Sequence, residues 1–197
     1  MRIEIRNNSV IIDGYVNAID RFSKPIPGVR GKFIEKVSPG AFRRSLEARE
    51  NVDLLLNHNK NRKLGSTTEG NLELFEDNIG LRAICIITDP EVIEKAGKKE
   101  LRGWSFGFYK KKDKWEQGES GYEERTLEEL DLFEVTILDD TRQPAYIGTS
   151  IEVREDEEVL SENREMEVRV VIVDETTEPN LIDYSKYENE IKQITRS

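Results

Sequence analysis

The stretch Leu101-Arg102-Gly103-Trp104-Ser105-Phe106-Gly107-Phe108-Tyr109 has the alternation of a β-strand whose two faces differ in character. Trp104, Phe106 and Phe108 share one face, whereas Gly103 and Gly107 flank Ser105 on the other. Glycines weaken a strand, so this bare strip suits a surface where a second backbone, such as a peptide substrate, approaches the serine closely. The alternative is a serine on the solvent face of an edge strand, and the stretch alone is compatible with both.

Composition narrows the class of protein. A chain of 197 residues can bury a core of its own. Its one cysteine excludes an internal disulfide, and Cys85 lies in an apolar run typical of a buried strand. The formal net charge of −10 argues against nucleic-acid binding. Without a signal-peptide pattern or a membrane-spanning apolar run, we expect a protein that is neither secreted nor inserted in a membrane.

Apolar and alternating patterns predict a mainly β chain with a few helices, of the α+β class. Strands are expected within residues 3–16 around an Asn7-Asn8-Ser9 turn, at 52–59, 72–76 and 81–87, in the serine stretch, and at 130–138. A helix from Ser38 to about Ala48 should have Ser38 as its cap and Pro39 in its first turn. A second should begin after the cap Asp89 and end near Gly97. Proline and glycine predict a long loop over residues 20–32, and residues 113–124 form the tip of a loop or hairpin.

His58 is the only histidine of the chain and lies at the end of the apolar strand expected at residues 52–59. A histidine in such a place is often structural. A serine nucleophile, however, needs a base that titrates near neutral pH, and this chain offers one.

Glu134 lies in the strand expected at residues 130–138. Alternation should put Phe133, Val135 and Ile137 on one face and Glu134 on the other. An acid among apolar neighbours is costly unless it is paired, and His58 is the candidate partner. The alternative is a carboxylate in water at a sheet edge.

Gly103-Trp104-Ser105-Phe106-Gly107 also satisfies the G-x-S-x-G pattern of α/β-hydrolases. That fold places the serine between a strand and a helix, with the histidine later in the chain. Here the histidine comes first and no helix is expected after Phe108, so the pattern does not indicate an α/β-hydrolase.

Four motifs together resemble the phage prohead maturation proteases, distant relatives of the herpesvirus assemblin serine proteases. They are Glu35-Lys36-Val37-Ser38-Pro39-Gly40-Ala41-Phe42, Leu55-Leu56-Asn57-His58-Asn59, Gly103-Trp104-Ser105-Phe106-Gly107-Phe108 and Leu132-Phe133-Glu134-Val135-Thr136-Ile137-Leu138. The resemblance covers roughly residues 11–150. It implies a small barrel-like β core with helices packed around it. It also implies cleavage of the major capsid protein precursor and its scaffold segment, and of the protease itself, inside the assembling prohead in the host cytoplasm.

The resemblance implies that Ser105 is the nucleophile, His58 the general base and Glu134 the acid that orients His58. The assemblin relatives use a second histidine in the third position, which this chain lacks, so Glu134, or alternatively Asp131, must take it. Alternation favours Glu134, because Asp131 is an odd number of positions away and should face the other side. Relatives also place an oxyanion-binding arginine after the third residue, and Arg142 lies at a comparable place. No metal ion or cofactor is expected.

Residues 151–197 differ from the rest, with a strongly acidic start followed by an alternating strand pattern and a segment with the spacing of a short amphipathic helix. We therefore expect a catalytic domain over residues 1–150 and a C-terminal extension over 151–197. The extension would dock on the capsid or scaffold, or be removed by self-cleavage; an inert solvated tail is the alternative. A homo-oligomer is possible. The rival function is an inactive assembly protein that keeps the fold and binds the capsid precursor.

Overall fold

The computed structural model describes residues 1–28, 31–119, 121–141, 152–154, 157–165 and 169–172, with side chains as far as residue 141. Its strands and helices follow in chain order: β1 (Arg2–Arg6), β2 (Ser9–Ala18), β3 (Ile26–Gly28), β4 (Gly31–Val37), α1 (Ala41–Ala48), β5 (Asp53–Leu56), β6 (Asn59–Ser66), β7 (Leu72–Glu76), β8 (Gly80–Ile87), α2 (Pro90–Gly97), β9 (Leu101–Gln117), β10 (Glu123–Asp139), β11 (Glu152–Arg154), β12 (Glu157–Glu165) and β13 (Arg169–Ile172).

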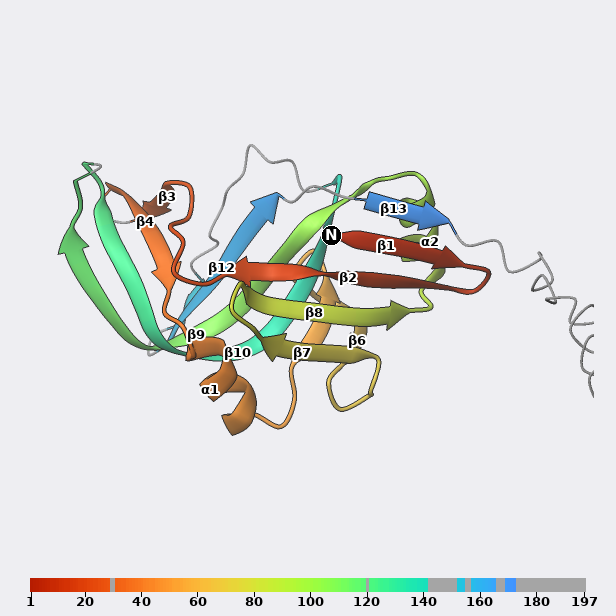
Figure 1. Ribbon diagram of the computed structural model, residues 1–197, viewed down its shortest axis with the longest axis horizontal. Coiled ribbons are helices and arrows are strands. Elements are labelled where there is room, and N and C mark those ends of the chain that lie inside the picture. The colour runs from red at the N-terminus through yellow and green to blue at the C-terminus, as the bar shows by residue number, and fades with distance from the viewer. Residues whose placement is uncertain (29–30, 120, 142–151, 155–156, 166–168, 173–197) are drawn as a thin grey trace, which may run out of the picture.

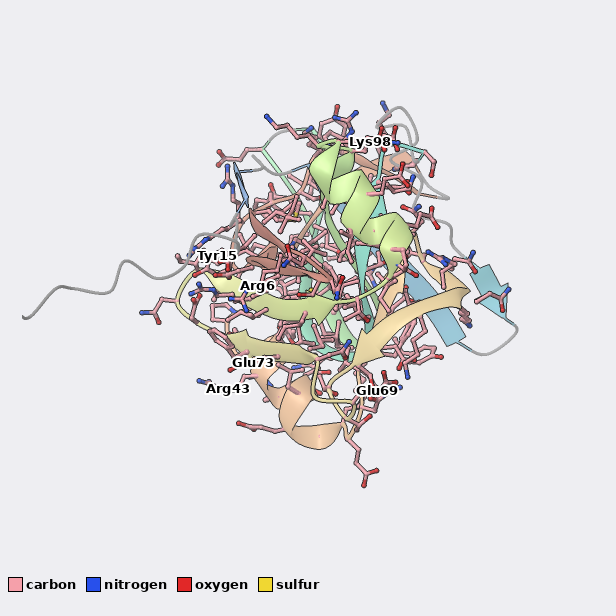
Figure 2. The ribbon with its side chains drawn as sticks, turned by 90° about the vertical axis from the view of Figure 1, so that its right-hand side faces the viewer. Arg6, Tyr15, Arg43, Glu69, Glu73 and Lys98 are labelled. Carbon is pink, nitrogen blue, oxygen red and sulfur yellow. The ribbon has the colours of Figure 1, made fainter. Side chains whose placement is uncertain are left out.

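The described strands form two sheets (Figure 1). One has the order β13-β1-β2-β8-β7. The other has the order β11-β12-β9-β10-β4-β3, with β5 added beside β10 and β6 beside β5, and it curls into a half-barrel. The predicted mainly β fold with a few helices is confirmed. In Figure 2, α2 and α1 lie at opposite ends of the view, where Lys98 and Arg43 mark them.

The aromatic face of β9 lies at the centre of the core. Trp104, Phe106 and Phe108 are fully buried there. Phe42 of α1 meets Phe106 edge-on, with ring centroids 5.3 Å apart. Cys85 is also buried in this core, as its apolar run predicted. The aromatic alternation of the serine stretch thus fixes which face of β9 packs into the hydrophobic core.

Several elements follow local signals. β1 and β2 pair as the predicted hairpin. β7 and β8 appear where their patterns placed them. At the start of α2, the Asp89 carboxylate accepts hydrogen bonds from the backbone N–H groups of Glu91 and Val92 at 3.0 and 3.1 Å. A cap and a proline inside a single segment are enough to begin this helix.

The predicted start of α1 is wrong, although its end at Ala48 is confirmed. The helix begins at Ala41, and its N-cap is Gly40 in a left-handed conformation with φ 82°. Glu76 of β7 supplies the cap, because its carboxylate accepts from the N–H of Gly40 at 2.5 Å and of Arg43 at 2.9 Å. A side chain distant in sequence therefore replaces Ser38.

Three segments are more regular than their composition predicts. The expected loop over residues 20–32 contains β3, which pairs with the start of β4. β9 and β10 extend toward each other, so only a short hairpin tip remains of residues 113–124. The charged and mostly exposed β6 was not predicted. In each case pairing with a neighbouring strand decides the conformation, a contribution that local composition does not carry.

The predicted boundary at residue 150 stays a prediction. Beyond it, β12 pairs with β9 and with β11, and β13 pairs in parallel with β1, so both sheets include strands from the C-terminal region. β13 lies within the alternating pattern that predicted a strand. The predicted short helix near the C-terminus lies outside the described residues.

Candidate active site

β10 carries Glu134 and lies between β9, which carries Ser105, and β5, which leads to His58. Along one edge it pairs with β9, with Glu134 opposite Gly107 and Thr136 opposite Ser105. Along the other edge it pairs in parallel with β5, with Ile137 opposite Leu56. The end of β5 and the N-terminal part of β9 therefore lie on either side of the same segment of β10.

β5 ends at Leu56, so the strand predicted over residues 52–59 is wrong at its end. His58 is instead the second residue of the two-residue turn between β5 and β6. Leu56 pairs with Asn59, and the two residues between them, Asn57 and His58, have φ of 56° and 58°. Positive φ at both central residues is the type I′ pattern of tight hairpins. Asn and His tolerate this left-handed region better than most residues.

This turn brings the imidazole of His58 between the other two candidates. Its Nε2 lies 2.8 Å from Ser105 Oγ, and its Nδ1 lies 2.5 Å from Glu134 Oε1. Ser105 is fully buried, and the side chains of His58 and Glu134 are 12% and 7% exposed. The structure therefore brings the serine, the histidine and the glutamate into one hydrogen-bonded chain.

This geometry has a definite chemical capacity. With the Nδ1–H of His58 donating to the Glu134 carboxylate, Nε2 is left as an acceptor for the Ser105 hydroxyl proton. A serine next to such a base can act as a nucleophile, and the carboxylate stabilises the imidazolium that forms. Within the described residues, no group of three or more His, Cys, Asp or Glu side chains is arranged to hold a metal ion.

Comparison with known families places the chain. Residues 1–163 match the caudovirus prohead serine proteases. The chain belongs to this family. The predicted resemblance to phage prohead proteases is therefore confirmed. No curated protein and no solved structure matches the chain.

The prohead protease match includes the whole hydrogen-bonded chain and most of β12. It also includes Arg142, the predicted oxyanion donor, but that residue lies outside the described part of the structure. Neither helix among the described residues is long and apolar enough to span a membrane.

The predicted faces of Glu134, Val135 and Ile137 in β10 are confirmed, but the predicted face of Phe133 is wrong, because the strand contains a bulge. Leu132 lies opposite Phe108 and Glu134 opposite Gly107, which leaves Phe133 as the extra residue. Leu132 therefore joins the core, whereas Phe133 packs against Tyr109, with ring centroids 4.7 Å apart.

The bulge also removes the alternation argument against Asp131. Asp131 lies opposite Tyr109, two positions from Gly107 on β9, so the register puts both acids on the same face. They differ in their partners. Asp131 binds Arg49, with Oδ1 2.6 Å from Nη1, whereas Glu134 binds His58.

Two further residues of this site escaped sequence analysis. Thr136 accepts a hydrogen bond from the backbone N–H of His58 at 3.0 Å. Asn57 accepts one from the N–H of Asp139 through Oδ1 at 3.1 Å. A signal was present for Thr136, a polar residue two positions from Glu134 in an apolar strand. The predicted substrate-facing role of Gly103 and Gly107 stays a prediction.

Proposed function

We propose that this chain is a serine endopeptidase of prohead maturation in which Ser105 is the nucleophile, His58 the general base and Glu134 the acid that orients His58. The observation that carries the proposal is the hydrogen-bonded chain from Ser105 Oγ through both nitrogens of His58 to Glu134 Oε1. Family membership supports a serine protease of capsid maturation in general.

In the proposed reaction, Ser105 Oγ attacks the carbonyl carbon of a peptide bond while His58 Nε2 takes the hydroxyl proton. Glu134 stabilises the resulting imidazolium. The tetrahedral intermediate collapses, the C–N bond breaks, and His58 gives its proton to the leaving amine. An ester on Ser105 remains. Water attacks this ester with His58 again as the base, which releases the carboxylic acid and restores the serine.

The substrates we propose are the major capsid protein precursor, its scaffold segment and the chain itself, inside the assembling prohead. The polypeptide supplies every group that the reaction requires, so no cofactor is invoked. By the family resemblance, Arg142 would donate to the oxyanion of the tetrahedral intermediate.

The C-terminal region has a proposed part in access to the serine. β12 covers the edge of β9 that β10 does not pair with, and places Asn163 opposite Ser105. An extended substrate could pair along that edge only if β12 left it. We propose that release of the extension, by docking or self-cleavage, opens β9 to a substrate strand.

Covalent labelling tests the proposal. A fluorophosphonate should modify the wild-type chain at Ser105, and Ser105→Ala should abolish labelling without loss of the fold. Ser66→Ala removes another fully buried serine and is the matched control, which should label normally. A folded wild-type protein that stays unlabelled even after release of the extension would instead favour the inactive assembly protein.

Co-expression with the capsid precursor, followed by intact mass analysis, tests the substrates. We expect shortened capsid precursor and shortened protease with the wild-type chain, and full-length masses for both with Ser105→Ala. His58→Ala should behave like Ser105→Ala. The double variant should be no worse than either, because the two residues act as one unit.

A further inference from the structure

A single buried hydroxyl joins two parts of the turn that carries His58. Thr136 on β10 is fully buried. Its Oγ1 donates to the carbonyl oxygen of Leu55 at 2.9 Å and accepts from the N–H of His58 at 3.0 Å. The hydroxyl therefore ties the end of β5 and the turn residue itself to β10.

The turn needs such support because its conformation is unusual. Asn57 and His58 both have positive φ, which carries a conformational cost for residues other than glycine. β10 holds Asn57 as well: its N–H donates to the carbonyl of Ile137 at 2.9 Å, and its Oδ1 accepts from Asp139. On the main chain of His58 itself, the N–H donates a hydrogen bond to Thr136 Oγ1.

Thr136 is also the direct cross-strand neighbour of Ser105. It lies opposite Ser105 in the β9–β10 pairing. The path from Ser105 to His58 through Thr136 is thus one cross-strand pair and one hydrogen bond. At the end of this path, His58 Nε2 lies 2.8 Å from Ser105 Oγ.

We propose that Thr136 is a positioning residue, whose hydroxyl sets the place of the His58 imidazole relative to Ser105 and Glu134. The inference rests on the proposed serine protease function. Thr136 takes no part in proton transfer, because its one proton is donated to Leu55. Its loss would let the turn shift, and a displacement of about 1 Å at such a site costs about 100-fold in rate.

The test uses the full chain and the second-order rate of fluorophosphonate labelling at Ser105. Thr136→Val keeps the shape and removes the hydroxyl, whereas Thr136→Ser keeps the hydroxyl. We expect labelling about 100-fold slower for the valine variant and within a few-fold of wild type for the serine variant. Thr126→Val, the same change at the far end of β10 opposite Lys36 and Lys114, should label at the wild-type rate.

A spectroscopic readout separates positioning from general stability. His58 is the only histidine, so the downfield proton NMR signal of an Nδ1–H bonded to a carboxylate can belong to no other side chain. It should be present in wild type and Thr136→Ser and lost or weakened in Thr136→Val, with circular dichroism showing that each variant is folded.

Wild-type labelling and an unchanged signal in Thr136→Val would overturn the proposal, as would equal losses in the valine and serine variants. If Thr136→Val does not fold, Thr136→Ala and Thr136→Ser decide, since the hydroxyl is what distinguishes them. Equal labelling rates for Thr136→Ala and Thr136→Ser overturn the proposal. Failure of both the valine and the alanine variant to fold also overturns it, because the hydroxyl is then needed for folding. Absence of labelling in wild type, even after release of the extension, would defeat the protease function. The NMR signal would still test whether Thr136 positions His58.

Discussion

The side chain of Glu134 lies against the bare backbone of Gly107, its cross-strand partner. A Cβ placed on Gly107 would be 2.7 Å from both Cγ and Oε1 of Glu134, and 2.8 Å from the ring of Phe133. Glu134 reaches His58 through the space that a side chain on Gly107 would fill. One of the two glycines beside Ser105 is therefore explained inside the molecule, without reference to a substrate.

Gly107→Ala should displace the carboxylate that holds His58. Contacts this short force a neighbour to move, and Glu134 can do so only by giving up its place beside Nδ1. We expect fluorophosphonate labelling of Ser105 to fall about 100-fold, as for a misplaced catalytic group. Gly97→Ala is the control, because a Cβ there meets no atom within 4 Å. Equal labelling rates of Gly107→Ala and wild type would show that Glu134 can move away from the added methyl group and still bind His58.

Glu134→Gln keeps the shape of the acid but removes the charge that stabilises the imidazolium. By analogy with the aspartate of other serine protease triads, turnover on the capsid precursor should fall by roughly two to four orders of magnitude. Asp131→Asn is the matched control on the same face of β10, and it should cost little activity because Asp131 pairs with Arg49. The opposite pattern, with the asparagine variant inactive, would assign the third role to Asp131.

Asp139 should make stability depend on pH in the acid range. Its carboxylate is buried; burial opposes ionisation, but hydrogen bonds from Thr141 and Lys95 lower its pKa to about 2. Since the folded pKa is below the unfolded value, the stabilisation is complete above about pH 4 and is lost as pH falls toward 2. It amounts to about 2 kcal/mol at pH 7.

Urea unfolding of Asp139→Asn checks this expectation. The free energy of unfolding should be lower than that of wild type at pH 7, and the difference should narrow between about pH 4 and pH 2. Glu116→Gln, which removes an exposed acid paired with Lys114, should leave the curve unchanged. If the difference in free energy of unfolding between the variant and wild type stays constant down to pH 2, the charge of Asp139 is not what stabilises the fold.

Cys85 should report unfolding of the core. The side chain is buried, and burial raises the pKa of its thiol, so the reactive thiolate is scarce. We expect no alkylation by iodoacetamide in native protein, and modification in denaturant with the same midpoint as loss of the circular dichroism signal. Lys98→Cys adds an exposed thiol as the positive control. Rapid alkylation of native wild type would show that the core opens locally.

The sequence by itself determined the elements whose signals are local. The aromatic alternation around Ser105 set the face of β9 that packs into the hydrophobic core, and Asp89 with Pro90 set the start of α2, because side-chain direction and capping act within a few residues. It also identified the serine, histidine and glutamate that meet, since each stands out chemically: a hydroxyl between glycines, a single imidazole and an acid in an apolar strand.

Only the tertiary structure decided how these residues meet. The bulge at Phe133 shifts every later residue of β10 by one position, and strict alternation cannot show where such a residue is inserted. The left-handed turn at His58 forms between a predicted strand and one with no apolar pattern. Thr136 and Gly107 acquire their roles across strands, as Glu76 does at the start of α1. Cross-strand pairing joins positions far apart in the chain, so the fold alone creates those contacts.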